Sequence, residues 1–180
     1  MKLKTNRLIL KEYNEKDILS LIKNINNINI AKNVSSIPHP YTKHDATWWI
    51  NNCKEKSRKT PRESYEFGIR LKTNTDVIGG IGCFGIDYQN KIGELGCWLG
   101  EYYWKKGIMS EAAKKLIDFS FKNLKLKKLV WKAYTNNKAS NILAKKLGFE
   151  LKNTLKNKAK CLATGKIHDY NLYELIKIKI

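Results

Sequence analysis

The spacing of apolar residues along the chain predicts a mixed α/β protein. Apolar and polar positions alternate, as in strands, over residues 6–13, 65–71, 77–86, 92–99 and 129–134, and residues 149–154 and 170–178 would supply two more strands. Helical spacing over residues 15–25, 108–121 and 139–147, and a further helix over about 45–56, complete the pattern. The expected order is β α α β β β α β α β β.

Local signals mark the ends of these elements. Thr42 and Asp45 form a T-x-x-D variant of the capping box before the second helix, and Asn74 to Asp76 is typical of a hairpin turn. Four glycines in the strand over 77–86 favour a bulge or a close approach of backbone. No linker or internal repeat divides the chain, so we expect residues 1–180 to form a single domain.

Composition excludes several classes of protein. With 42% hydrophobic residues and a net charge of +19, the chain is too apolar for a disordered polycation. No stretch approaches the roughly 18 apolar residues that span a bilayer, and the charged start does not resemble a signal peptide. We therefore expect a soluble, cytoplasmic protein with no membrane partner. Its four separated cysteines and three scattered histidines predict free thiols and no metal site.

The positive charge has two readings. Only four of the 35 basic residues are arginine, whereas proteins that read nucleic acids favour arginine for bidentate contacts. No helix-turn-helix, zinc or RNP pattern is present, so no specific nucleic-acid partner is expected. The lysines would either attract an acidic partner or form a solvated surface that follows from genome composition.

The junction over residues 99–111 carries the clearest chemical signal. A strand ends there, and a short loop with Gly107 leads directly into a helix, whose free amides and dipole favour an anion. Lys105 and Lys106 would add positive charge, and Ser110 would either donate its hydroxyl or cap the helix. Neither the Walker spacing nor the dinucleotide fingerprint occurs, so the junction is either an anion site or an ordinary capped turn.

Two sequence blocks resemble a known family. They are E-L-G-C-W-L-G-E-Y-Y-W-K-K-G-I-M-S-E-A-A and, further on, N-K-A-S-N-I-L-A-K-K-L-G-F. Together with the N-terminal T-N-R-L-I-L-K-E-Y, they resemble the GNAT acyltransferase superfamily, and most of all the RimJ/RimL-type ribosomal-protein N-terminal acetyltransferases. The resemblance implies a central mixed, mostly antiparallel sheet of about seven strands. This sheet would splay between its fourth and fifth strands and be flanked by about four helices.

The resemblance also implies acetyl-CoA as cosubstrate. Its pyrophosphate would bind the amides of the loop before the third helix. This loop matches the family pattern R/Q-x-x-G-x-G/A, except that Trp104 stands at its first position and Met109 at its last. Its pantetheine arm would lie along the end of the strand before the loop. The implied cofactor contacts are Cys97, Trp98, Leu99, Trp104, Lys105, Lys106, Gly107, Ile108, Met109, Ser110, Asn137 and Ser140.

The reaction implied is direct attack of a neutral amine on the thioester, which needs one group to accept a proton and another to donate one. Glu94 matches the position of the family's base, and otherwise it is a strand carboxylate paired with a lysine. Many relatives have a tyrosine where this chain has Ala144, so Ser140 is the expected donor to the leaving thiolate, unless it only caps its helix. Because the family transfers directly, no acyl-enzyme on Cys97 is expected.

The acceptor is less well defined by sequence. A protein N-terminal amine, as on an acidic ribosomal protein, is the first expectation, and a small-molecule amine such as an aminoglycoside or polyamine is the second. A basic nucleic-acid-binding protein or a noncatalytic acyl-CoA-binding protein is the alternative of a different class. Trp48 and Trp49 would either wall the acceptor pocket or pack in the core. The protein would be a monomer or a homodimer.

Overall fold

The computed structural model describes residues 1–177, which form eight strands, five α-helices and two short 3-10 helices. The strands are β1 (Lys2–Lys4), β2 (Leu8–Lys11), β3 (Tyr65–Leu71), β4 (Gly79–Asp87), β5 (Ile92–Leu99), β6 (Lys128–Tyr134), β7 (Glu150–Lys160) and β8 (Ile167–Ile176). The helices are η1 (Glu15–Asp17), α1 (Ile18–Ile25), α2 (Ile28–Ala31), α3 (Lys43–Arg58), η2 (Glu101–Tyr103), α4 (Ile108–Lys122) and α5 (Lys138–Lys146).

The order of elements confirms the predicted α/β pattern, with additions at short elements. β1 and α2 are too short for their periodicity to show in the sequence, and they raise the numbers of strands and helices above the seven and four expected. β7 extends to Lys160, well beyond the predicted end at residue 154. The predicted end of the last strand at Ile178 lies outside the described residues.

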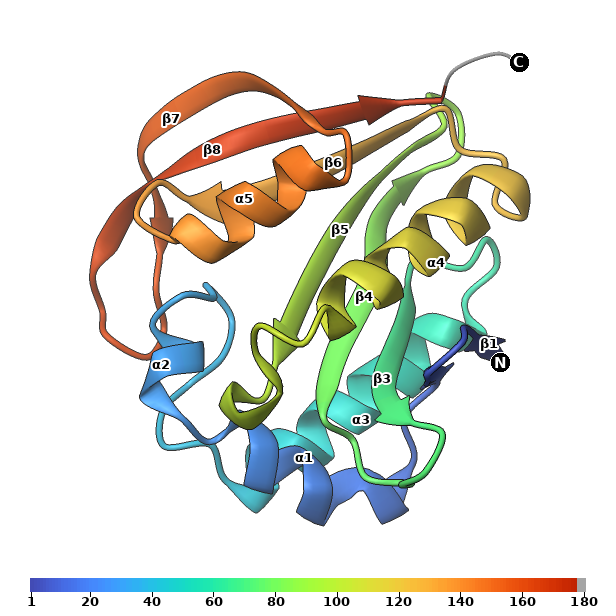
Figure 1. Cartoon of the computed structure of the whole chain (residues 1–180), viewed down its shortest axis with the longest axis vertical. Helices are drawn as coiled ribbons and strands as arrows, with labels where there is room; N and C mark the ends of the chain where they lie inside the picture. Colours follow the sequence, from blue (N-terminus) through green and yellow to red (C-terminus); the bar gives the residue numbers. More distant parts are fainter. Residues whose placement is uncertain (178–180) are drawn as a thin grey trace.

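The eight strands form one sheet in the order β1-β2-β3-β4-β5-β6-β8-β7. Only β5 and β6 run parallel, and their pairing stops at Leu95 and Trp131, although both strands continue. Beyond this point the two strands separate, and we call the opening between them the fork (Figure 1). The fork is the predicted splay between the fourth and fifth expected strands. These strands are β5 and β6 in the structure, because the additional strand β1 precedes them.

Helices cover both faces of the sheet and bury an apolar cluster on each. In Figure 1, α4 and α5 lie in front of the sheet and α3 lies behind it. Leu116 and Phe119 of α4 belong to the larger cluster, whereas Leu21 of α1 and Ile50 of α3 belong to the smaller one. At the start of α3, Thr42 and Asp45 form the predicted capping box.

One buried ion pair ties the first helices to the sheet. The Arg70 guanidinium on β3 donates to the Asp17 carboxylate of η1 at 2.7 Å, and both side chains are almost fully buried. No helix within residues 1–177 combines the length and apolarity that a membrane crossing requires.

Candidate active site

A single large cavity of about 1600 Å³ extends from the start of α4, through the fork, to the space bounded by α3 and the β7–β8 hairpin. This volume exceeds that of most small-molecule pockets and has room for two ligands that meet at the fork. Every site residue expected from the sequence lines it except Lys106. The lining members are Glu94, Cys97, Trp98, Leu99, Trp104, Lys105, Gly107, Ile108, Met109, Ser110, Asn137 and Ser140.

The start of α4 presents unpaired amides to this cavity. Gly107 caps the helix with a φ of 72°, and Lys105 also has a positive φ of 59°. The first helical bond runs from the Glu111 amide to the Gly107 carbonyl at 3.1 Å, so the amides of Ile108, Met109 and Ser110 have no helical acceptor. Ser110 makes no capping bond, and the helix dipole adds positive potential to these donors. The geometry suits a bound anion.

The loop before α4 is held in place by the turn between β1 and β2. Arg7 donates from Nε to Glu111 at 2.6 Å and from Nη1 to the Lys106 carbonyl at 3.1 Å, and Thr5 donates to the same carboxylate at 2.6 Å. Burial would raise the pKa of Glu111, but the bonds from Thr5 and Arg7 hold it below its usual value. We call these bonds from Arg7 and Thr5 the clamp. The clamp was not predicted from the sequence, although Arg7 is one of only four arginines.

Two other side chains at the loop depart from their expected places. The Lys106 ammonium lies 4.0 Å from the centre of the Tyr102 ring, so its charge is directed at that ring, while Lys105 lines the cavity. The Trp104 indole donates to the Leu99 carbonyl at 2.7 Å. One of the backbone groups expected to pair with a pantetheine arm at the fork is therefore already occupied.

The start of α5 supplies polar groups on the opposite side of the fork. Asn137 caps the helix by accepting a bond from the Ser140 amide at 3.1 Å, while its Nδ2 group donates to the Asn33 carbonyl at 3.4 Å and keeps a second N–H for a further bond. Ser140 is therefore not the cap. Its Oγ accepts a bond from the Trp131 indole at 3.0 Å, and within residues 1–177 its hydroxyl proton has no hydrogen-bond acceptor. Ser140 is thus free to donate into the cavity.

Asn141 fixes this part of the site, and sequence reasoning missed it. Its Nδ2 group donates to the carbonyls of Tyr134 and Asn137, at 2.9 and 2.7 Å. Its Oδ1 accepts from the Tyr173 hydroxyl and from Asn171, both at 2.8 Å. These bonds hold α5 against β6 and β8. Nothing in the spacing of the sequence distinguishes Asn141 from the other asparagines.

Glu94 lies on β5 next to the fork. Its carboxylate accepts a bond from the Lys132 ammonium of β6 at 2.6 Å, so it has the lysine partner foreseen as the alternative reading. Side-chain exposures of 26% for Glu94 and 41% for Lys132 leave the pair in contact with solvent, where such a bridge contributes little stability. Glu94 therefore lines the cavity beside the fork but already has a partner.

Glu66 is a second carboxylate in the cavity, and sequence reasoning did not identify it. Burial raises its pKa from 4.5 to about 7, although the positive charges of Lys56 and Arg62 lower it. Within the described residues it makes no hydrogen bond and no ion pair, because Arg62 donates instead to Glu12 and to the Ser64 carbonyl. Alternation along β3 predicts an outward polar position for Glu66, and only the tertiary fold places it in the cavity.

Aromatic side chains form much of the remaining wall. Trp48 lines the cavity with 60% of its surface exposed, so it does not pack in the core, whereas Trp49 packs edge-on against Tyr13 at 6.3 Å. On the other side, the Tyr134 ring lines the cavity and stacks on the His168 ring at 4.4 Å. This part of the cavity therefore suits a ligand with some apolar surface.

The comparisons with known proteins agree with this geometry. The family model described as the acetyltransferase (GNAT) domain matches residues 7–150. The chain is 35% identical over 115 residues to the uncharacterised N-acetyltransferase p20 of Bacillus licheniformis, covering 64% of each chain. It is 36% identical over 101 residues to a ribosomal-protein-serine acetyltransferase of Escherichia coli, covering 56% of this chain and 55% of that one.

A solved structure shows the same fold over nearly the whole length. RimL, a ribosomal-protein alpha-N-acetyltransferase in complex with coenzyme A, superimposes with a TM-score of 0.85, 20% identity and 98% coverage of both chains. The two sequence relatives match over less than two thirds of their own length, while the family model spans most of this chain. The chain therefore belongs to the GNAT acetyltransferase family.

Proposed function

We propose that the protein transfers the acetyl group of acetyl-CoA to the N-terminal amine of a protein, with a ribosomal protein as the favoured acceptor. The observation that carries this proposal is the continuous cavity through the fork, with free helix amides at one end and carboxylates at the other. The coenzyme A complex of RimL and the name of the Escherichia coli relative support the cosubstrate and the acceptor. We take residues 1–180 as one domain.

The residues present fit acetyl-CoA. The amides of Ile108, Met109 and Ser110 would hold the pyrophosphate, and Lys105 would add a positive charge beside it. Past the fork, the Nδ2 group of Asn137 would donate to an amide of the pantetheine arm. When bound, the cosubstrate supplies the activated acetyl group, and the chain's own residues direct it toward the acceptor.

The catalytic groups would work as a pair. Glu94 takes a proton from the acceptor ammonium, and Lys132 keeps the carboxylate oriented toward the fork. The amine nitrogen then forms a bond to the thioester carbon, and the carbon–sulfur bond breaks. The hydroxyl of Ser140 gives its proton to the departing sulfur and regains one from the nitrogen, either directly or through water. Glu94 then releases the proton it took to solvent, which restores the base for the next turnover.

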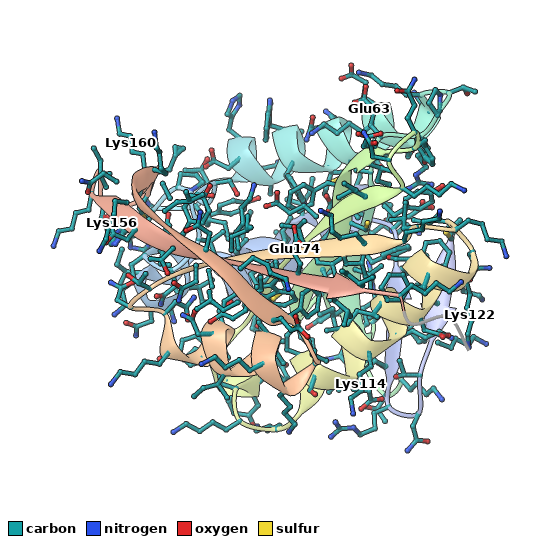
Figure 2. The ribbon with its side chains drawn as sticks, turned by 90° about the horizontal axis from the view of Figure 1, so that it is seen from above. Glu63, Lys114, Lys122, Lys156, Lys160 and Glu174 are labelled. Carbon is teal, nitrogen blue, oxygen red and sulfur yellow. The ribbon has the colours of Figure 1, made fainter. Side chains whose placement is uncertain are left out.

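A small-molecule amine is the second candidate acceptor, because the cavity alone does not exclude it. A nucleic-acid partner is less favoured, since only four of the 35 basic residues are arginine. Among the lysines, Lys114 and Lys122 on α4 lie apart from Lys156 and Lys160 on β7 (Figure 2). The four free cysteines fit a reducing compartment, which supports a cytoplasmic location.

The test combines binding and turnover. Calorimetric titration with acetyl-CoA should show binding to the wild-type protein. A panel of N-terminal peptides from ribosomal proteins, with an aminoglycoside and a polyamine beside them, should then release free thiol for the true acceptor class. Glu94→Gln should lower turnover by about 10²-fold or more while leaving acetyl-CoA affinity unchanged. Failure of the wild-type protein to bind acetyl-CoA would overturn the proposal.

A further inference from the structure

The face of the sheet opposite α4 carries a row of three residues that leads from Glu66 toward the fork. Glu66 on β3 pairs with Gly82 on β4, and Gly82 pairs with Gly96 on β5. Paired residues point to the same face, and neighbouring strands lie about 4.8 Å apart. Gly96 lies one residue beyond Leu95, the last residue of β5 that pairs with β6. The row therefore ends at the fork.

The two glycines leave space that neighbouring side chains fill. A Cβ atom added at Gly82 would overlap the Glu66 carboxylate, so this carboxylate lies directly over Gly82 and extends toward the fork. A Cβ atom at Gly96 would lie 2.8 Å from the Phe84 ring, so that ring covers the next position in the row. Glu66 and Phe84 both line the cavity.

Further aromatic groups border the same space. Gly80 lies two residues before Gly82 on β4 and on the same face of the sheet. A Cβ atom at Gly80 would meet the Tyr13 hydroxyl and the Trp98 indole nitrogen. The surroundings of Glu66 are thus a carboxylate among aromatic rings, which is a chemical combination suited to an ammonium ion. Burial removes part of the water that this carboxylate would bind outside the protein, so a cation that pairs with it replaces lost solvation.

The other charged and titratable groups near Glu66 do not neutralise it. Within residues 1–177 no lysine or arginine nitrogen pairs with its carboxylate, and Arg62 is held by Glu12 at 2.7 Å and by the Ser64 carbonyl at 2.6 Å. Glu94, by contrast, already has Lys132 as its partner. The titratable groups that surround Glu66 on this face are Tyr13, Cys53, Lys56 and Arg62, and Glu12 and Lys54 line a small pocket together with it.

We infer that Glu66 is the counter-ion that binds the protonated amine of the acceptor, with the Phe84 ring beside it, before the proton is removed at the fork. This inference rests on the proposed function and assigns the ammonium subsite within it. Glu66 acts in recognition and Glu94 in proton transfer. A neutral analogue of the acceptor would lose the ion pair and bind more weakly.

A matched pair of peptides tests this assignment. A short synthetic peptide with a free N-terminal serine and its Nα-acetylated form are titrated into the protein in the presence of coenzyme A, which cannot donate an acetyl group. We expect the wild-type protein to bind the free amine at least about tenfold more tightly, and Glu66→Gln to abolish that preference. Glu55→Gln is the matched control, because Glu55 is exposed on the same α3 that covers the cavity and does not line it.

A second variant separates position from charge. In Gly82→Ala the added methyl group displaces the Glu66 carboxylate, so the preference for the free amine should fall although Glu66 is still present. Combined with Glu66→Gln, it should cause no further loss. The preference of the wild-type protein should be greatest between pH 7 and 8, where Glu66 is ionised and an α-amino group still carries its proton.

The outcomes distinguish this inference from the proposed function. If acetyl-CoA binds and the peptide is acetylated, but Glu66→Gln keeps the wild-type preference for the free amine, the assignment of Glu66 is wrong and the proposed function stands. A wild-type protein without any preference for the free amine would also overturn the assignment. If acetyl-CoA does not bind, the proposed function fails, and the peptides then test Glu66 on the protein alone.

Discussion

Glu66→Gln is expected to stabilise the protein more at pH 8 than at pH 5. The pKa of Glu66 is about 7 in the folded protein, compared with 4.5 for an ordinary glutamate. The folded state therefore holds the proton more tightly than the unfolded state. The stability linked to this group is fully present below pH 4.5 and is lost as the pH rises toward 7. Glutamine has no such loss, because it stays neutral at every pH.

The size of the effect follows from the two pKa values. Between pH 5 and pH 8, the wild-type protein should lose about 2.5 kcal/mol of unfolding free energy through Glu66 alone. For a chain of 180 residues, this difference corresponds to about 5 to 10 °C in Tm. Glu66→Gln should therefore gain that much in Tm over the wild type when the pH is raised from 5 to 8.

Thermal unfolding followed by circular dichroism, at both pH values and without ligand, measures this gain. Other carboxyl groups with shifted pKa values, such as Glu12 and Glu111, are present in both proteins and cancel in the comparison. Glu55→Gln, at an exposed position on α3, is the control variant measured alongside. If Glu66→Gln differs from the wild type by the same amount at pH 5 and pH 8, Glu66 is solvated or paired, and the reasoning about its isolation fails.

Four further changes test the cofactor side of the site and the proton donor. Gly107→Val should weaken acetyl-CoA binding about 5- to 30-fold in calorimetry, because a side chain disfavours the φ of 72° by about 1–2 kcal/mol and turns the loop amides away. Lys105→Ala should cost less, and equal losses would argue against a site built from backbone. Arg7→Ala releases Glu111 and the Lys106 carbonyl, so it should weaken acetyl-CoA severalfold, and unchanged affinity would show that the clamp does not support the loop. Ser140→Ala should lower kcat by about 10²-fold without changing acetyl-CoA affinity, and an unchanged kcat would remove Ser140 from the role of proton donor.

Much of the fold could be predicted from local pattern alone. The helix over residues 108–122 repeats its apolar positions on one face, and the strand over 92–99 ends at a loop that leads directly into this helix. Both features are local, so the helix start with its free amides followed from the sequence. β1 and α2 did not, because three or four residues are too few to show a period.

The acceptor side of the site was harder to predict, because it depends on which residues meet across strands. Glu66 and Gly82 lie on consecutive strands of a predicted hairpin, but only the register of β3 with β4 places the carboxylate over the glycine. Arg7 and Glu111 likewise meet only in the folded chain. For Trp48 the local pattern was misleading. Its place in a helix favoured a position in the core, but the structure leaves it exposed at the cavity.

The early end of pairing between β5 and β6 has a consequence for how the protein survives in a cell. Past Leu95 and Trp131, the facing edges of the two strands lack a neighbouring chain, so a ligand that carries amide groups can complete the ladder there. A molecule that binds only the folded state raises the unfolding free energy in proportion to the logarithm of its concentration. With acetyl-CoA as the proposed ligand of this edge, its depletion would lower the unfolding free energy of the protein, and proteolysis of the unliganded protein would become faster.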